Sequence, residues 1–302
     1  MDQKDLELIG RLAADGRSDA SAISMQLCIS PENVERRLRL MLREGIIEGF
    51  SAFFDRRMFG YDTTFVKLHF LAKDRRRVLE GILSLPQIAM VYPNMDGFML
   101  CEVVHYDRDS LASAIKEMER LADPNTVSAT FEPLLPDEVP EAPRGADLKV
   151  LSHLVRDGRA TAEAMAKELG MKVPDVERSV SSLISSGAAK VLPLVQEGEV
   201  QPFPSFSVLV LLKHGCSIDS CFPEVLRISR EAWHSVPLRN PGGVWMRCFG
   251  RDLHGMDGML ERFRRLDFVS DVQVMMPEGI VFRREVDQRL LLPAKGKKDG
   301  KK

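Results

Sequence analysis

The chain has 302 residues, of which 44% are hydrophobic and 28% are charged, and its formal net charge is −2 at pH 7. No apolar run reaches the ~18 residues that a membrane-spanning helix needs, which argues against an integral membrane protein. Five cysteines are too few, and odd in number, for a disulfide framework, and the N-terminal residues lack the pattern of a secretory signal. We therefore expect a cytoplasmic globular protein with more than one domain.

Residues 1–55 contain three short helical patterns followed by strand-like residues, which is the order of a winged helix-turn-helix unit. The first pattern ends at the turn signal Asp15-Gly16. Ser18 is expected to cap a second helix that runs to Leu27. The strand-like residues that follow the third helix are expected to form a two-stranded wing.

The third helix is expected to begin at Ser30-Pro31, because serine suits the N-cap and proline suits the first helical position. The side chains on its predicted core face are Val34, Leu38, Met41 and Leu42. The helix is expected to end at Gly45.

Residues 62–136 change to the element order βαββαβ, which is typical of a ferredoxin-like domain. The central hairpin is marked by the turn signal at residues 94–97, whose sequence is Asn-Met-Asp-Gly. Residues 137–146 follow, with two prolines and three acidic residues, and are expected to be a linker.

The chain then repeats itself. Residues 5–17 read DLELIGRLAADGR, and residues 147–159 read DLKVLSHLVRDGR. An internal repeat of this length predicts one architecture built twice. The second copy is expected to hold a degenerate winged helix-turn-helix at 147–195 and a βαββαβ domain at 203–285. Residues 293–302 are lysine-rich and are expected to form a disordered basic tail.

The expected elements of the second βαββαβ domain follow the same pattern, with helices at 222–233 and 256–266. Its strands are expected at 207–213, 236–238, 244–249 and 269–276. The whole chain is therefore predicted to be α+β, as two tandem copies of a winged helix-turn-helix plus a ferredoxin-like domain.

The exposed face of the third helix carries residue types that read DNA. Asn and Arg pair with adenine and guanine edges, and Arg also holds phosphate. On a helical wheel Leu40 also points away from the core. The predicted DNA-binding residues are Ser30, Asn33, Arg36, Arg37, Arg39 and Arg43.

A solvated arginine face on an ordinary helix is the alternative, and two observations favour it. Residues 1–50 hold seven basic and nine acidic residues, so this unit is net negative. Leu40 also stands where a DNA-facing residue would normally be polar.

The second copy differs, because its residues at the positions of Arg37, Arg39, Leu40 and Arg43 are all serine. Losing these arginines removes most of the phosphate attraction that drives DNA binding, so the second unit is expected to be a weak DNA contact or a spacer.

Several motifs in residues 5–61 resemble the Lrp/AsnC (feast/famine) family of transcription regulators. The matching pieces are D-L-x-L-I, D-G-R, S-P-x-x-V-x-R-R, R-E-G-I-I-x-G-F and F-D-x-x-x-x-G-Y. The resemblance implies double-stranded DNA as a partner and pairing through the βαββαβ sheets. A homodimer or an intramolecular pseudo-dimer of the two copies is therefore expected.

The resemblance also implies a small effector, such as an amino acid, at the loop between the second and third strands of each βαββαβ domain. The effector-binding residues that it implies are Asn94, Asp96, Gly97, Asn240 and Gly242. Neither loop keeps the family's T-G-x-x-D run, and both sequences also suit plain hairpin turns that need no ligand.

His214, Cys216 and Cys221 lie close together in the second copy, and such residues can hold zinc or iron. Their H-x-C-x₄-C spacing is not a standard one, and buried free cysteine is commonplace. We therefore expect no metal site and no cofactor.

Two other functions remain open. Relatives with the same domain plan decarboxylate sirohaem, and residues 234–247 weakly resemble their second-to-third strand region through Arg239, Asn240 and Trp245. The histidine-tyrosine run expected between those strands is absent. A partner-binding protein that no longer binds DNA is the third possibility, and the acidic first unit favours it.

Overall fold

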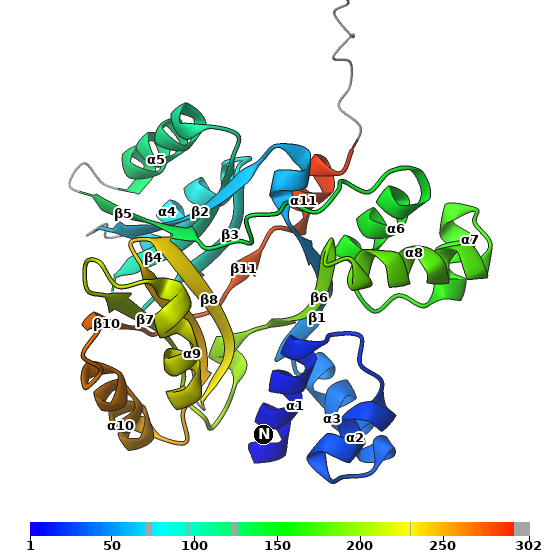
Figure 1. Ribbon diagram of the computed structural model, residues 1–302, viewed down its shortest axis with the longest axis horizontal. Coiled ribbons are helices and arrows are strands. Elements are labelled where there is room, and N and C mark those ends of the chain that lie inside the picture. Colours follow the sequence, from blue (N-terminus) through cyan, green and yellow to red (C-terminus); the bar gives the residue numbers. More distant parts are fainter. Residues whose placement is uncertain (71–73, 96, 123–125, 230, 293–302) are drawn as a thin grey trace, which may run out of the picture.

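The computed structural model describes residues 1–70, 74–95, 97–122, 126–229 and 231–292. The predicted α+β class and the two-copy architecture are confirmed (Figure 1). The helices and strands of the first copy are α1 (Gln3–Ala14), α2 (Ala20–Leu27), α3 (Pro31–Arg43), β1 (Ile47–Phe54), η1 (Arg56–Phe59), β2 (Asp62–His69), α4 (Arg75–Ser84), β3 (Ile88–Pro93), β4 (Phe98–His105), α5 (Arg108–Ala122) and β5 (Val127–Pro133).

The second copy repeats this order and then adds a short strand and a helix. Its elements are α6 (Gly145–Arg156), α7 (Ala162–Leu169), α8 (Val173–Ser185), β6 (Ala189–Val195), η2 (Glu197–Glu199), β7 (Ser205–Leu212), α9 (Ile218–Ile228), β8 (Ala232–Asn240), β9 (Gly243–Phe249), α10 (Leu253–Arg264), β10 (Val269–Met275), β11 (Val281–Phe282) and α11 (Arg284–Leu290). No helix in the described residues is both long and apolar enough to cross a membrane. The tail predicted for 293–302 lies outside the described residues.

Local sequence explains where the first three helices begin. Asp2 and the Asp5 side chain form a reciprocal capping box at the start of α1. Ser30 caps α3 as predicted, and Pro31 takes its first position. The second helix is capped by Asp19 rather than by Ser18, because the carboxylate of Asp19 accepts the Ala22 amide.

The core face of α3 is narrower than predicted. Val34 and Met41 are buried, and Leu38 is half-buried against the same core. Leu42 is 40% exposed, so its assignment to the core was wrong. It follows Met41 directly, and the 100° step between neighbouring residues carries its side chain off the buried face.

The predicted two-stranded wing within each unit is also wrong. Strand β1 of the first copy instead pairs with β6 of the second, antiparallel, with Phe50 opposite Pro193 and Phe54 opposite Ala189. Each unit therefore contributes one strand to a sheet that joins the two copies (Figure 1).

The repeated Asp-Gly-Arg segments reinforce this junction. Arg17 Nη1 donates to the Gly158 carbonyl at 2.6 Å, and Arg159 Nη2 donates to the Ser18 carbonyl at 3.0 Å. Gly16 donates its amide to the Val191 carbonyl at 3.1 Å. The exchange is reciprocal, so the two helix-turn-helix units are locked together as a pseudo-symmetric pair, which we call the Asp-Gly-Arg clasp.

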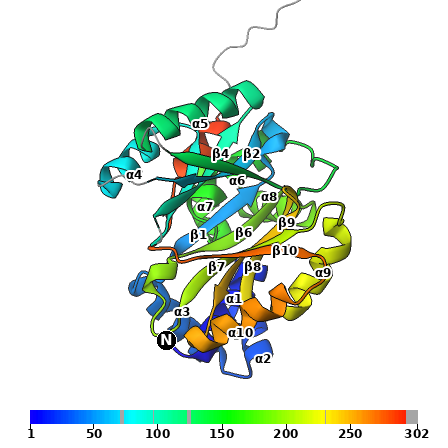
Figure 2. The same ribbon diagram turned by 90° about the vertical axis from the view of Figure 1, so that its left-hand side faces the viewer.

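The two ferredoxin-like domains form one nine-stranded sheet in the order β10-β7-β9-β8-β5-β2-β4-β3-β11. Strands β5 and β8 join the two halves at Glu132–Asn240 and Pro133–Leu238. The joined sheet folds on itself, since one apolar cluster includes Phe65 and Leu209 from opposite halves. Helices α4 and α5 cover the outer face of one half, and α9 and α10 cover the other (Figure 2).

The structure corrects three elements that we expected in or beside the second copy. The first helix of its ferredoxin-like domain is α9, which ends at Ile228 rather than at residue 233. Trp233 therefore lies on a strand, β8, which is longer than the 236–238 segment expected. Helix α6 begins at Gly145, inside the segment expected to be a linker.

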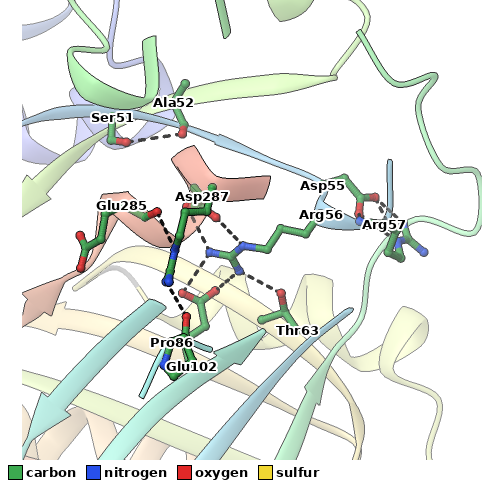
Figure 3. Close-up of polar contacts among 11 residues, drawn as sticks. Ser51, Ala52, Asp55, Arg56, Arg57, Thr63, Pro86, Glu102, Glu285 and Asp287 are labelled. Atoms are coloured by element: carbon green, nitrogen blue, oxygen red, sulfur yellow. Dashed lines mark hydrogen bonds and ion pairs between the residues drawn. The ribbon is translucent and has the colours of Figure 1, made fainter. Parts of the chain in front are cut away.

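Residues 281–290 of the second copy add a strand and a buried carboxylate to the ferredoxin-like domain of the first copy. Strand β11 pairs with β3, and the helix that follows it, α11, supplies Asp287. Arg56, which is 8% exposed, donates from Nε to Asp287 at 2.7 Å and from Nη1 to Glu102 and Thr63 at 2.7 and 2.9 Å (Figure 3). Burial opposes the charge, but the two carboxylates outweigh it and raise the pKa of Arg56.

The clasp makes a prediction about Gly16. A Cβ placed on this residue would lie 2.6 Å from the Val191 carbonyl oxygen, a backbone atom that cannot yield easily. We expect Gly16→Ala to lower the free energy of unfolding by about 1–3 kcal/mol, measured by urea denaturation. Gly10→Ala in α1 is the control, because its Cβ meets no atom within 4 Å and alanine should stabilise the helix by about 0.5–1 kcal/mol. Equal effects of the two substitutions would contradict the close approach.

The Arg56 cluster makes a second prediction. Asp287→Asn removes one of two charged partners from a buried guanidinium, so we expect a loss of about 2–3 kcal/mol in the free energy of unfolding. Glu285→Gln on the same helix is the matched control: this carboxylate is 56% exposed and pairs with Arg283 at 2.7 Å. Its loss should cost less than about 1 kcal/mol. If both variants unfold at the wild-type denaturant concentration, Asp287 does not anchor α11.

Candidate functional site

Helix α3 presents three arginines to solvent. The side chains of Arg39 and Arg43 are 68% and 73% exposed, and Arg36 is exposed as well. Arg36 donates to Asn33 Oδ1 at 2.8 Å, and Arg39 pairs with Glu35 at 3.1 Å. Exposed pairs of this kind contribute little free energy, so these guanidinium groups can exchange their neighbours for phosphate oxygens at small cost.

Arg37 lies elsewhere. Its side chain is 14% exposed and bonds to Asp2 at 2.8 Å and Asp5 at 2.7 Å. Hydrogen bonding to Asp2 raises the pKa of Arg37, with Asp5 adding to the shift. The structure thus places this predicted DNA contact in the joint between α1 and α3, where it holds the helix at a fixed angle.

The equivalent helix of the second copy, α8, lacks both the row of three exposed arginines and the buried arginine link to the first helix of its unit. Ser179 stands where the first copy has Arg37, and it borders a hollow of about 590 Å³ beside Asp147. Arg178 is exposed and pairs with Asp175 at 3.3 Å. Lys172 occupies the N-cap without a side-chain capping bond. Copy two therefore offers a less basic helix that begins without a capping side chain.

The predicted effector residues of the first copy belong to a hairpin turn. Asn94 is 1% exposed, and its side chain donates to the Tyr92 carbonyl at 2.9 Å. Its own carbonyl accepts a short hydrogen bond from Arg75. Gly97 takes a φ of +88°, which favours glycine. Asp96 lies outside the described residues.

The effector residues expected in the second copy also take part in the sheet. Asn240 lies opposite Glu132, at the junction between β5 and β8. The Gly242 carbonyl accepts the Leu212 amide at 2.9 Å. Local turn and sheet geometry thus accounts for both loops.

His214, Cys216 and Cys221 are not brought together as a ligand set. No group of three or more His, Cys, Asp or Glu side chains within the described ranges is placed to hold a metal ion. Arg239 and Trp245, which carry the weak resemblance to sirohaem decarboxylases, do not form a common site either. Arg239 is 55% exposed and faces Asp137 at 3.7 Å, whereas Trp245 is buried.

A large cleft of about 1200 Å³ lies between α1 and the β8, α9 and α10 side of the second copy. Its aromatic wall is Trp233 stacked on Phe249, with ring centroids 5.6 Å apart. The basic residues that line it are Arg11, Arg227, Arg251, His254 and Arg262. Among these, Arg262 pairs with Glu231 at 2.7 Å. The arrangement can receive a large flat ligand with acidic groups at its edge.

Sequence reasoning missed this cleft because its two walls come from different copies. Arg11 is far from Arg251 in the chain, and no spacing links them. The sequence holds one weak signal of this cleft. The residues Gly250-Arg251-Asp252 directly follow the aromatic residue that ends β9, and they lead into α10.

Comparisons with known proteins are consistent with a chain that contains two copies of one unit. No protein-family model matches the chain. An uncharacterised HTH-type transcriptional regulator of Pyrococcus furiosus is 24% identical over 125 residues, which is 40% of this chain and 81% of the relative. An HTH-type transcriptional regulator of Mycobacterium tuberculosis is 26% identical over 130 residues, 41% of this chain and 85% of the relative. Each relative thus has about the length of one copy, and the expected resemblance to transcription regulators of the helix-turn-helix type is confirmed.

A solved structure matches both copies at once. The sirohaem decarboxylase NirDL is 14% identical, covers 95% of this chain and 97% of its own, and has a TM-score of 0.57. The same protein in complex with an iron-uroporphyrin III analogue gives a TM-score of 0.55 at 13% identity, over 94% of this chain and 96% of that one. At such identity the likeness concerns the fold, including the arrangement of the two copies.

Proposed function

We propose that the protein is a cytoplasmic, sequence-specific DNA-binding transcription regulator that reads DNA mainly through α3. The observation that carries this proposal is the exposed face of that helix. It gathers Asn33, Arg36, Arg39 and Arg43 on a three-helix unit in a chain whose relatives are HTH-type regulators.

Each residue has a distinct role in this proposal. Asn33 and Arg36 lie in the first half of α3, where a recognition helix meets base edges. Arg39 and Arg43 follow along the helix and suit phosphate contacts. Ser30 caps the helix, and Arg37 positions it through Asp2 and Asp5 rather than touching DNA.

Because the Asp-Gly-Arg clasp holds both helix-turn-helix units in one chain, the protein in this proposal carries two recognition helices that differ in their affinity for DNA. Such a protein should bind an asymmetric site, with one half-site read by α3 and the other held weakly by α8. Turn and sheet contacts account for Asn94 and Asn240, so this function requires no effector at their turns.

The test uses a duplex selected by the wild-type protein from a random-sequence library. We expect the Arg36→Ala, Arg39→Ala double variant to bind this duplex at least about tenfold more weakly. The slope of log K against log salt should become shallower by about 1, because Arg39 is the one of the two arginines assigned to a phosphate contact. Arg178→Ala, the equivalent of Arg36 in copy two, should have a smaller effect.

Arg76→Ala in α4 is the control, because this arginine is 89% exposed and lies outside the helix-turn-helix units. Unchanged binding and an unchanged salt slope in the double variant would overturn the role of α3. Failure of the wild type to enrich any duplex would overturn DNA binding itself.

A second function is favoured by two observations, the full-length likeness in fold to NirDL and the arginine-lined cleft. We propose that this cleft binds an anionic tetrapyrrole, with Arg11, Arg227 and Arg251 holding peripheral carboxylates. Trp233 supplies an aromatic wall against which a flat macrocycle packs. The proposed function is binding of the tetrapyrrole, and decarboxylation of the bound molecule would be a further step.

Iron uroporphyrin III is the probe for this second function. We expect its absorption band to shift on titration with the protein, and Arg251→Ala to weaken binding about tenfold through loss of a charged hydrogen bond. Arg264→Ala is the matched control on α10, since this arginine pairs with Glu261. Equal affinity in both variants, or no band shift with the wild type, would exclude the cleft as a tetrapyrrole site.

A further inference from the structure

The second copy has a hollow at a place that is filled in the first copy. It lies between α6 and α8, and its volume of about 590 Å³ is in the range of small-molecule binding sites. The helices of the two helix-turn-helix units begin and end at equivalent residues, so each residue that lines the hollow has a counterpart in the first copy. Three lining residues are smaller than their counterparts: Ala146 replaces Lys4, Ser179 replaces Arg37, and Ser182 replaces Leu40.

The first copy shows what this place can hold. There the guanidinium of Arg37 donates to Asp5 at 2.7 Å and to Asp2 at 2.8 Å. The second copy keeps one of these carboxylates, because Asp147 stands at the position of Asp5 and lines the hollow. It has lost the cation, because Ser179 stands at the position of Arg37. The hollow therefore contains an acceptor whose counterpart holds a guanidinium.

The carboxylate of Asp147 is available to a ligand. No side-chain hydrogen bond or ion pair joins it to another of the residues that the structure describes. Its counterpart Asp5 also accepts the amide of Asp2 at 2.7 Å, as part of the capping box of α1. Helix α6 begins at Arg144 without a side-chain capping bond. Both oxygens of Asp147 can therefore accept from a molecule that enters the hollow.

The other charged residues of the hollow indicate how such a molecule would lie. Asp175 is already paired with Arg178 at 3.3 Å. Lys172 is exposed at the start of α8, which has no capping side chain. An ammonium group and an uncapped helix N-terminus both attract acceptor oxygens. The hollow thus suits a group with a cation at one end, for Asp147, and a carbonyl at the other, for Lys172.

We propose that this hollow receives an arginine side chain of a partner protein, with the guanidinium at Asp147 and a peptide carbonyl at Lys172. A guanidinium fits better than an ammonium, because its planar fork bonds both oxygens of a carboxylate and it is less strongly hydrated. The hydroxyl oxygen of Ser179 is a further acceptor. Because α8 carries serines where α3 has three arginines, its surface attracts phosphate less, which favours a protein over DNA as the occupant. The proposal rests neither on DNA reading by α3 nor on the arginine-lined cleft.

The probe is the acetylated and amidated tripeptide glycyl-arginyl-glycine, whose only charge is the guanidinium. Its partner is the same tripeptide with lysine in place of arginine, which carries an ammonium instead. Full-length ¹⁵N-labelled protein is titrated with each peptide. We expect the arginine peptide to shift the amide signals of Asp147 and Ser179 in a saturable manner, and the lysine peptide to bind about fivefold more weakly. Free L-arginine should bind more weakly than the arginine peptide, because it has no peptide carbonyl for the start of α8.

Three variants locate the binding. Ser179→Arg places the chain's own guanidinium beside Asp147, as in the first copy, so we expect it to abolish the saturable shift. Ser181→Arg is the matched control: it adds the same charge to α8 from an exposed position that does not line the hollow, and it should leave the affinity within about twofold. Asp147→Asn should weaken binding about tenfold through loss of the charged acceptor. Circular dichroism checks that each variant keeps the α+β fold.

Four results would overturn the proposal. Absence of a saturable shift with the wild type would mean that the hollow holds water only. Unchanged affinity in Ser179→Arg would place the peptide elsewhere on the protein. Equal affinity for the two peptides would mean attraction by charge alone. Tighter binding of free L-arginine than of the arginine peptide would make the hollow a site for a small molecule rather than for a protein.

Discussion

The pairing of β1 with β6 is the constraint on which the rest of the molecule depends. A single strand from each helix-turn-helix unit has no partner within its own unit, so its backbone groups must be satisfied by the other copy. The Asp-Gly-Arg clasp then fixes the angle between the units. Gly16 and Gly158 approach the backbone of the opposite copy so closely that a side chain at either position would push the two copies apart locally.

This constraint explains why the notable sites lie between the copies. The arginine-lined cleft and the Arg56 cluster both draw residues from both halves. Duplication within one chain removes the need for identical halves, so each half can specialise. The first keeps an arginine-bearing α3, and the second contributes both tryptophans and most of the cleft.

Periodicity and turn chemistry were enough to predict the repeated α+β plan and the start of α3 at Ser30. They failed where a tertiary partner decides the outcome. Arg37 has the residue type of a DNA contact, and only the position of Asp2 and Asp5 shows that it is a structural link. A wing was expected because a lone strand cannot show in sequence which copy it will pair with. Trp233 was placed on a helix because its neighbours lack clear alternation.

The attachment of α11 has a consequence for the order in which the protein is assembled during synthesis. Arg56 receives its second carboxylate from a residue 231 positions later, and β3 gains its outer neighbour from the same segment. The first ferredoxin-like domain therefore leaves the ribosome with an exposed strand edge and with Arg56 paired to Glu102 alone. It must wait for nearly all of the second copy before it closes, and in that interval β3 is open to pairing with another nascent chain.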